Sequence, residues 1–201
     1  MRKLACTAIA IVGLALLLGA GTAVAQDNVY DLSYFSNAHT TGAPDATLRL
    51  VNDGNVSDSS PAGDLCASIY VFDTTEELQE CCSCRITPNG ILSLSVNTNL
   101  TANTLTRRTL NRGVVKVVSS NLSGGTCDAT VSVPHIGIRG WLTHIQKGLV
   151  VNETQAYATT EEELSDATFG TAEQADLAED CAVLTELGTG QGICSCADRG
   201  Y

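Results

Sequence analysis

The sequence predicts a mainly β protein, an antiparallel β-sandwich of the immunoglobulin-like type with a short helical appendage at its C-terminal end. Apolar and polar residues alternate along short runs, as they do in half-buried strands. Turn-forming residues separate these runs at the spacing typical of a sandwich. Apolar residues make up 44% of the 201 residues, which is enough for a folded core. A closed barrel has the same pattern and is the alternative.

The first 25 residues have the three parts of a secretory signal peptide. Arg2 and Lys3 form a basic start, residues 4–20 are largely apolar, and Ala23-Val24-Ala25 has the small residues that a signal peptidase recognises. We therefore expect residues 1–25 to be removed and the mature chain to be secreted or periplasmic. An uncleaved membrane anchor is the alternative, because the segment is just long enough to span a bilayer.

The strands are expected to follow one another through residues 26–158, the predicted sandwich domain. The clearest are residues 46–51 and 92–97, where apolar and polar side chains alternate. Further strands are expected at residues 29–35, 66–72, 114–119, 130–133, 136–143 and 149–158. Turn residues such as Asn52-Asp53-Gly54 and Pro88-Asn89-Gly90 link them.

Residues 159–201 are predicted to form a helical appendage that packs on the same domain. A brief helix is expected from Thr160, because Glu161–Glu163 would stabilise its N-terminus. A stronger helix is expected from Thr171, which would form a capping box with Gln174.

This stronger helix has an apolar face and a clear end. Leu177, Cys181 and Leu184 recur at helical spacing, and Gly188 would stop the helix. The glycines after it would let the tail fold back, so that Cys194 or Cys196 reaches Cys181 and forms a disulfide.

The chain has nine cysteines, of which eight remain after removal of the signal peptide. An even number in an exported chain predicts a disulfide framework, although spacing alone leaves the pairing open. Cys81 and Cys82 are neighbours in the chain, so in an extended segment they would point to opposite faces and join two different elements. The disulfide candidates are Cys66, Cys81, Cys82, Cys84, Cys127, Cys181, Cys194 and Cys196.

Four of these cysteines also form two C-x-C pairs, Cys82 with Cys84 and Cys194 with Cys196. Brought together as thiolates, they would supply a tetrahedral sulfur site for Zn²⁺ or Cu⁺. Structural zinc sites use wider spacing, and an oxidising compartment favours disulfides. The metal site is therefore the alternative to the disulfides.

Four segments of the sequence stand out together: residues 80–84 (Glu-Cys-Cys-Ser-Cys), 138–144 (Ile-Arg-Gly-Trp-Leu-Thr-His), 175–181 (Ala-Asp-Leu-Ala-Glu-Asp-Cys) and 190–196 (Gly-Gln-Gly-Ile-Cys-Ser-Cys). With these segments the chain resembles a group of exported, cysteine-rich bacterial proteins of unknown activity. The resemblance implies a bacterial, extracytoplasmic setting. It assigns no catalytic or binding residue.

The remaining candidate residues favour structural roles. Residues 53–64 have oxygen side chains at the spacing of a calcium loop, but Asp58 stands where that loop needs glycine. The histidines His39, His135 and His144 match no metalloprotease motif, and His135 and His144 are expected to pair with backbone groups at strand edges. Trp141, the single tryptophan, is expected to fill the core or to pack on a disulfide.

Charge limits the partners that the protein can have. There are 22 acidic residues against 11 basic ones, and the formal net charge of −11 repels nucleic acids and anionic lipid surfaces. Bases concentrate in residues 81–152, whereas residues 26–80 and 153–201 are acidic. We expect the blocks to meet within the molecule or as complementary faces of neighbouring molecules.

These observations together predict an exported structural or interaction module of the bacterial cell envelope or exterior. No assembled catalytic motif is found, so neither catalysis nor a cofactor is expected. Binding to itself or to another envelope protein would use charge-complementary faces or an exposed sheet edge. The alternatives are a thiolate metal-binding protein and a secreted hydrolase, whose carboxylates would meet only in the fold.

Overall fold

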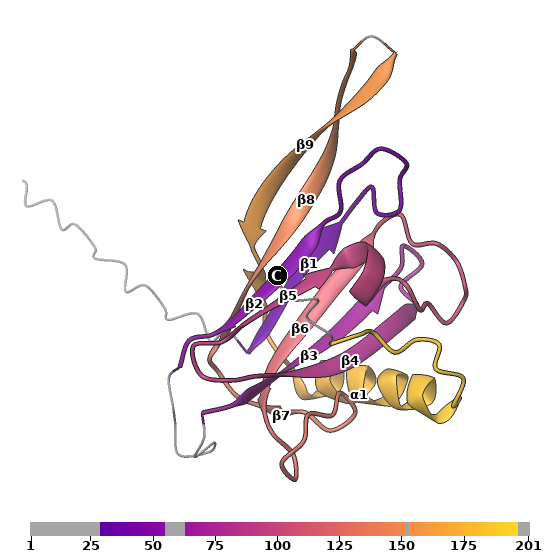
Figure 1. The fold of residues 1–201 in the computed structure, drawn as a ribbon. Helices are drawn as coiled ribbons and strands as arrows, with labels where there is room; N and C mark the ends of the chain where they lie inside the picture. The colour runs from indigo at the N-terminus through magenta and orange to yellow at the C-terminus, as the bar shows by residue number, and fades with distance from the viewer. Residues whose placement is uncertain (1–28, 55–62, 152, 197–201) are drawn as a thin grey trace, which may run out of the picture.

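The fold is described from a computed structural model and covers residues 29–54, 63–151 and 153–196. In these residues the strands form two antiparallel sheets, and one α-helix follows them (Figure 1). The predicted mainly β fold with a C-terminal helix is confirmed. The predicted signal peptide and residues 55–62 of the candidate calcium loop lie outside the described residues.

The larger sheet has the strand order β10-β1-β6-β3-β4, with β7 beside β6. Its strands are β1 (Tyr30–Phe35), β3 (Leu65–Phe72), β4 (Leu78–Ile86), β6 (Gly113–Asn121), β7 (Val133–Pro134) and β10 (Ser165–Asp166). Nearly all of β3 is buried, because one face of this sheet meets the second sheet and the other meets the helix. A strand covered on both faces needs apolar residues at successive positions, and β3 has them.

The smaller sheet has the order β5-β2-β8-β9. Its strands are β2 (Thr47–Asn52), β5 (Ile91–Ser95), β8 (Ile138–Val151) and β9 (Thr154–Glu163), and a π-helical turn, η1 (Val96–Leu100), follows β5. Strands β8 and β9 form a long hairpin whose outer half, residues 146–151 and 153–158, projects beyond both sheets (Figure 1). We call this projecting segment the arm.

The main core lies between the two sheets. Leu48 and Leu50 reach it from β2, and Ile69 and Val115 reach it from β3 and β6. All four side chains are fully buried, and each such burial stabilises the fold by roughly 1.5–3 kcal/mol. The apolar residues whose alternation predicted β2 point into this core, and the polar residues between them point to the outer face of the sheet.

The helix α1 (Thr171–Glu186) covers the other face of the larger sheet. As predicted, Leu177, Cys181 and Leu184 form its buried face. The predicted capping box is wrong, because Gly170 is the N-cap and the Gln174 side chain donates instead to the backbone oxygen of Ser132, 2.9 Å away. Gln174 therefore fastens the helix to a neighbouring loop rather than to its own first turn.

Other boundaries also differ from those predicted. The brief helix predicted at residues 160–163 is wrong, because these residues belong to β9 and pair with β8. The strand predicted at residues 130–133 shrinks to β7. Strand β8 runs on to Val151, so it joins residues that were predicted as parts of two strands. In the described part of the chain no helix has both the length and the apolar character needed to cross a bilayer.

Candidate functional site

Four disulfides join all eight candidate cysteines. The pairs are Cys66–Cys127, Cys81–Cys181, Cys82–Cys194 and Cys84–Cys196. The predicted bond from Cys181 to the C-terminal tail is wrong, because Cys181 on the inner face of α1 lies directly over Cys81 of β4. The expectation that Cys81 and Cys82 join two different elements is confirmed, since Cys81 binds the helix and Cys82 binds the tail.

The C-terminal tail covers the edge of β4. The backbone nitrogen of Cys81 donates to the oxygen of Gly192 at 2.8 Å, and the nitrogen of Cys194 donates to the oxygen of Cys81 at 3.2 Å. The tail thus lies parallel to β4 and is held by two disulfides as well. A covered edge does not pair with foreign strands.

The alternative metal site is present as a cluster of sulfur atoms. The Sγ atoms of Cys82, Cys84 and Cys196 all lie within 4.8 Å of one another. Each of these sulfurs is bonded in a disulfide, and a disulfide sulfur is not the thiolate that binds Zn²⁺ or Cu⁺. Metal binding would therefore require reduction first.

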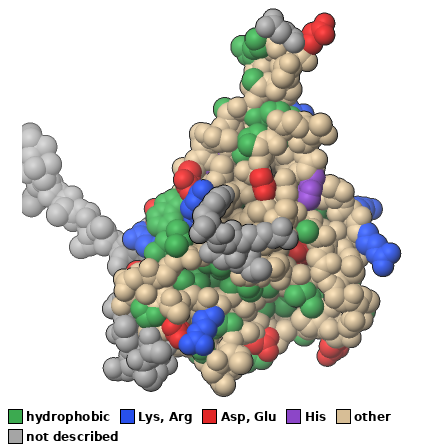
Figure 2. All heavy atoms as spheres, in the orientation of Figure 1, with side chains coloured by type: hydrophobic (Ala, Val, Ile, Leu, Met, Phe, Trp, Pro, Cys, Tyr) green, Lys and Arg blue, Asp and Glu red, His purple; other side chains and the backbone are tan. Residues whose placement is uncertain are grey.

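The arm exposes large apolar side chains near its tip. Leu149 is 84% exposed, Val150 63% and Val151 59%. Figure 2 shows hydrophobic side chains along this projection. An exposed apolar cluster on a projecting hairpin marks a surface that would be stabilised by contact with another molecule.

Strand β9 is the outermost strand of its sheet, and eight of its ten residues are exposed. The backbone nitrogen of Leu164 donates to the oxygen of Gly140 at 2.8 Å, which sets the alternation along this ladder. Even-numbered residues of the regular part of β9 therefore bond to β8, and odd-numbered residues direct their N–H and C=O groups outward. The outward set is Tyr157, Thr159, Glu161 and Glu163.

The glutamates at the base of β9 are paired with basic residues of other strands in the same sheet. Glu161 lies 2.5 Å from Arg49 of β2, and Glu163 lies 2.9 Å from Arg139 of β8. Glu162 lies 3.8 Å from the buried ring of His144. Through the pair of Arg139 and Glu163, the basic block of residues 81–152 meets the acidic block of residues 153–201 within the molecule.

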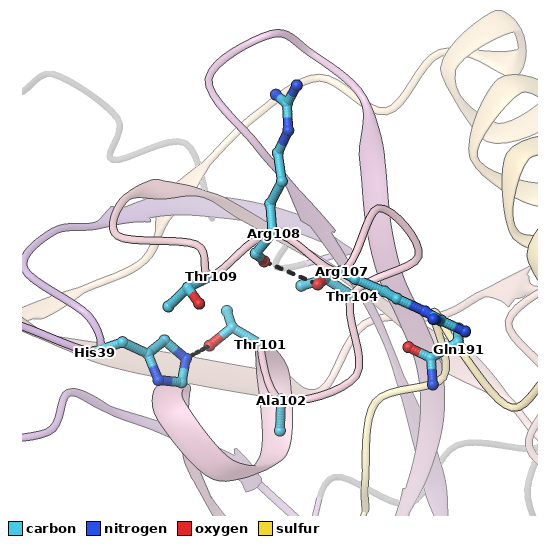
Figure 3. A pocket seen from close by; sticks show the side chains of 8 residues that line it. All are labelled: His39, Thr101, Ala102, Thr104, Arg107, Arg108, Thr109 and Gln191. Atoms are coloured by element: carbon cyan, nitrogen blue, oxygen red, sulfur yellow. Dashed lines mark hydrogen bonds between the residues drawn. The ribbon is translucent and has the colours of Figure 1, made fainter.

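A basic pocket of about 350 Å³ lies among the turn at His39, the loop of residues 101–109 and the C-terminal tail (Figure 3). His39 Nε2 lies 2.8 Å from Thr101 Oγ1, and the Thr101 hydroxyl donates to the oxygen of Val96 at 2.6 Å. Because that hydroxyl has only one proton, His39 Nε2 must be the donor in its bond to Thr101. The ring is thereby held in one orientation.

Two carboxyl groups are buried in ways that favour their neutral form. Glu80 is fully buried, its Oε1 accepts from the backbone nitrogen of Asn103 at 2.7 Å, and its Oε2 has no hydrogen-bond partner among the described residues. Burial raises the pKa of Glu80 to about 7. Burial, followed by repulsion from Asp166 and Glu163, raises the pKa of Asp31 to about 6.

Other candidate residues have structural surroundings. His135 Nδ1 lies 2.6 Å from the backbone oxygen of Ile136, as expected of a backbone-paired histidine. His144 departs from that expectation, because its Nε2 lies 3.4 Å from Ser33 Oγ and its Nδ1 has no hydrogen-bond partner among the described residues. Trp141 is only half-buried and is not part of the core, so the predicted core position is wrong. From the candidate calcium loop, Asp64 is ion-paired with Arg85.

Sequence reasoning missed both the arm and the basic pocket. The signal for the arm was Leu149-Val150-Val151, three apolar residues in a row beside a turn. The signal for the pocket was Arg107-Arg108 in a threonine-rich loop, but the sequence does not show which segments surround that loop.

No protein family model, curated protein or solved structure matches this chain.

Proposed function

We propose that this chain is an exported interaction module of the bacterial envelope or exterior, and that it associates with a second copy of itself through the edge of β9. The observation that carries the proposal is the long exposed edge of β9, continued by an arm with an apolar tip. An unpaired strand edge is a template for pairing with another strand.

The disulfide framework supports a location outside the cytosol. Disulfides persist in secreted and periplasmic proteins, whereas cytosolic thiols are kept reduced. The covalent links also prevent the β4 edge from opening, since the tail is bonded there at Cys194 and Cys196. Unlike the β4 edge, the β9 edge is not covered by the tail, so it is open to strand addition.

A second copy fits this edge in antiparallel orientation. A register centred on Thr159 places outward residues opposite outward residues, with Glu161 facing Tyr157 and Glu163 facing Gln155 of the other copy. No glutamate then faces a glutamate, whereas parallel pairing would align the three acids of both strands. The ion pairs with Arg49 and Arg139 further reduce repulsion along the edge.

The test is a proline at a position whose N–H points outward. Thr159→Pro removes one edge donor but no hydrogen bond of the β8–β9 ladder. Sedimentation equilibrium over a wide range of protein concentration should show a monomer–dimer equilibrium for the native protein and a shift toward monomer for Thr159→Pro. Thr159→Ala keeps the N–H group and is the matched control, so it should dimerise like the native protein.

Hydrogen exchange tests the same edge without substitution. Thr160 is bonded to β8 and should be protected at every protein concentration, whereas the outward amides of Thr159 and Glu161 should gain protection only as concentration rises. A native protein that remains monomeric, with these two amides exchanging freely throughout, would overturn self-association through β9.

The sulfur cluster favours a second candidate function, binding of a soft metal ion after reduction. Four thiolates from Cys82, Cys84, Cys194 and Cys196 would suit Zn²⁺ or Cu⁺. Thiol counting on protein isolated from its native compartment tests this second function. Four reactive thiols that become protected on addition of Zn²⁺ would favour metal binding, and the absence of reactive thiols would eliminate it.

A further inference from the structure

Several described basic residues have an acidic partner that Arg107, in the loop before β6, lacks. Arg49, Arg85, Lys116 and Arg139 each form an ion pair, whereas Arg107 forms none. The contrast is notable because acids outnumber bases two to one in the whole sequence. Unpaired positive charge in such a chain is available for a negatively charged ligand.

The basic pocket gathers groups that suit an anion. Its lining contains two arginines, a histidine, three threonines, a glutamine and an alanine, and no carboxylate. Three of these side chains, Arg107, Thr109 and Gln191, have no hydrogen bond or ion pair to another described residue. Guanidinium, hydroxyl and amide N–H groups are all donors to oxyanions.

The two neighbouring arginines are directed differently. Figure 3 shows the Arg107 side chain running toward Gln191, while the Arg108 side chain points away from His39 and Thr101. The charge of Arg108 acts on Asp73 instead. Burial alone would raise the pKa of Asp73, but hydrogen bonds from Thr75 and Glu77 and the charge of Arg108 together lower it. Arg107 is therefore the guanidinium of the pocket.

The loop that carries Arg107 is held in place before any ligand arrives. The Arg107 nitrogen donates to the oxygen of Thr104 at 3.1 Å, and the buried Thr104 hydroxyl donates to the oxygen of Arg108 at 2.9 Å. The Thr106 hydroxyl donates to Gln79 Oε1 at 2.6 Å, which anchors the loop to β4. Because the loop is already ordered, ligand binding costs little conformational entropy.

The backbone at the pocket is strained on two sides. His39 has φ of 50° and Arg107 has φ of 56°, a left-handed conformation that non-glycine residues seldom adopt. The His39 conformation is fixed by a bond from its own nitrogen to Asn97 Oδ1, 2.9 Å away. Such strain persists where surrounding structure enforces it, as at binding sites.

We propose that this pocket binds a small ligand through an oxyanion group, a carboxylate or a phosphate, with Arg107 as the charged contact and Thr109 and Gln191 as neutral donors. The tail supplies Gln191, and the Cys82–Cys194 disulfide fixes the tail beside the loop. The pocket thus joins three distant segments of the chain into one donor surface. The inference does not depend on pairing at β9.

The experiment is a titration of the isotope-labelled protein, followed by amide chemical shifts at constant ionic strength. The probes are inorganic phosphate and acetate, with chloride as the reference anion. Saturable shifts confined to residues 101–109 and to Gln191 are expected with at least one probe, and the stronger probe identifies the ligand as a phosphate or a carboxylate. Shifts no larger than those with chloride would overturn the proposal.

Two matched variants separate a site from general electrostatics. Arg107→Gln should weaken binding by at least about tenfold, because a charge-assisted hydrogen bond is lost. Arg108→Gln removes the same charge from the next residue and should change the affinity by less than about twofold. Equal losses of affinity in both variants would show that binding depends only on the overall surface charge.

Thr109→Val, which removes one hydroxyl at constant shape, should weaken binding about threefold and provides a test without any change in charge.

Discussion

The Sγ atoms of Cys82 and Cys84 lie 3.9 Å apart, although each belongs to a different disulfide. The two residues are two positions apart on β4, so their side chains share one face of the strand. Their partners, Cys194 and Cys196, have the same spacing on the tail. Two disulfides therefore lie side by side, within reach of thiol–disulfide exchange if one of them is opened.

We expect Cys84→Ser to scramble this pair. The substitution leaves Cys196 as a free thiol within 4.8 Å of Cys82 Sγ. Its thiolate would attack Cys82, form a Cys82–Cys196 bond and release Cys194 as the leaving thiolate. Non-reducing peptide mapping should find both the native and the exchanged linkage.

The control is Cys127→Ser, which frees Cys66 at another disulfide. Peptide mapping should find the other three linkages unchanged in this variant. A Cys84→Ser protein that retains only the Cys82–Cys194 bond, at a pH where thiols ionise, would contradict the expected exchange.

Removing the Cys81–Cys181 disulfide should destabilise the protein by about 2–4 kcal/mol, because the bond closes a long loop and holds the helix against the sheet. The double variant Cys81→Ala with Cys181→Ala leaves no free thiol. Urea unfolding measures its free energy of unfolding, and the native protein is the reference. The pair Cys66→Ala with Cys127→Ala opens a shorter loop, so it should cost somewhat less. An unchanged unfolding midpoint in the first variant would rule out a stabilising role for this bond.

The sequence predicted those parts of the fold that depend on local pattern. Leu48 and Leu50 alternate with polar residues, and α1 keeps its buried face through Leu177 and Leu184. Strand β4 was not predicted, because both of its faces are buried and its cysteines show no alternation. Glu161–Glu163 have the composition of a helix start, but pairing with β8 decides their conformation.

Little of the candidate site was accessible from the sequence. The partner of Cys181 depends on how α1 lies across the sheet, and the neighbours of Arg107 depend on where the tail folds back. Contacts between segments a hundred residues apart are set by topology, which a single sequence specifies only through the whole fold. The cysteine count predicted a disulfide framework, but it left open which cysteines pair with each other.

Stability should fall as the pH rises from about 4.5 to about 7, because the buried carboxyl of Glu80 has a pKa of about 7 in the folded protein. Below the pKa of the unfolded chain, near 4.5, both states hold the proton and no penalty exists. Between the two pKa values the folded state binds a proton that the unfolded state has lost, so each rise in pH favours unfolding. The full effect is up to about 3 kcal/mol above pH 7.

Glu80→Gln should remove most of this slope and should be more stable than the native protein at high pH, because an amide carries no charge to desolvate. The amide can still accept the bond from Asn103 through its oxygen. Denaturant unfolding at several pH values measures both proteins. A smaller slope of the same sign should remain, because Asp31 has a raised pKa as well. If the two proteins show equal slopes, Glu80 is not the titrating group.

Leu149→Asp should leave the stability of the monomer within about 0.5 kcal/mol of the native value, because Leu149 is 84% exposed and makes no core contact. If two copies pair through β9 in the proposed antiparallel register, the arm of each copy would lie along the smaller sheet of the other. A charged tip would then lose apolar contact, so the same substitution should weaken self-association. Val131→Asp is the control: Val131 is also exposed but lies in the loop before β7, away from the arm, so its dimerisation should match that of the native protein. Thermal unfolding at low concentration gives the stability, and sedimentation equilibrium gives the association. Equal association of both variants would place the interface away from the arm.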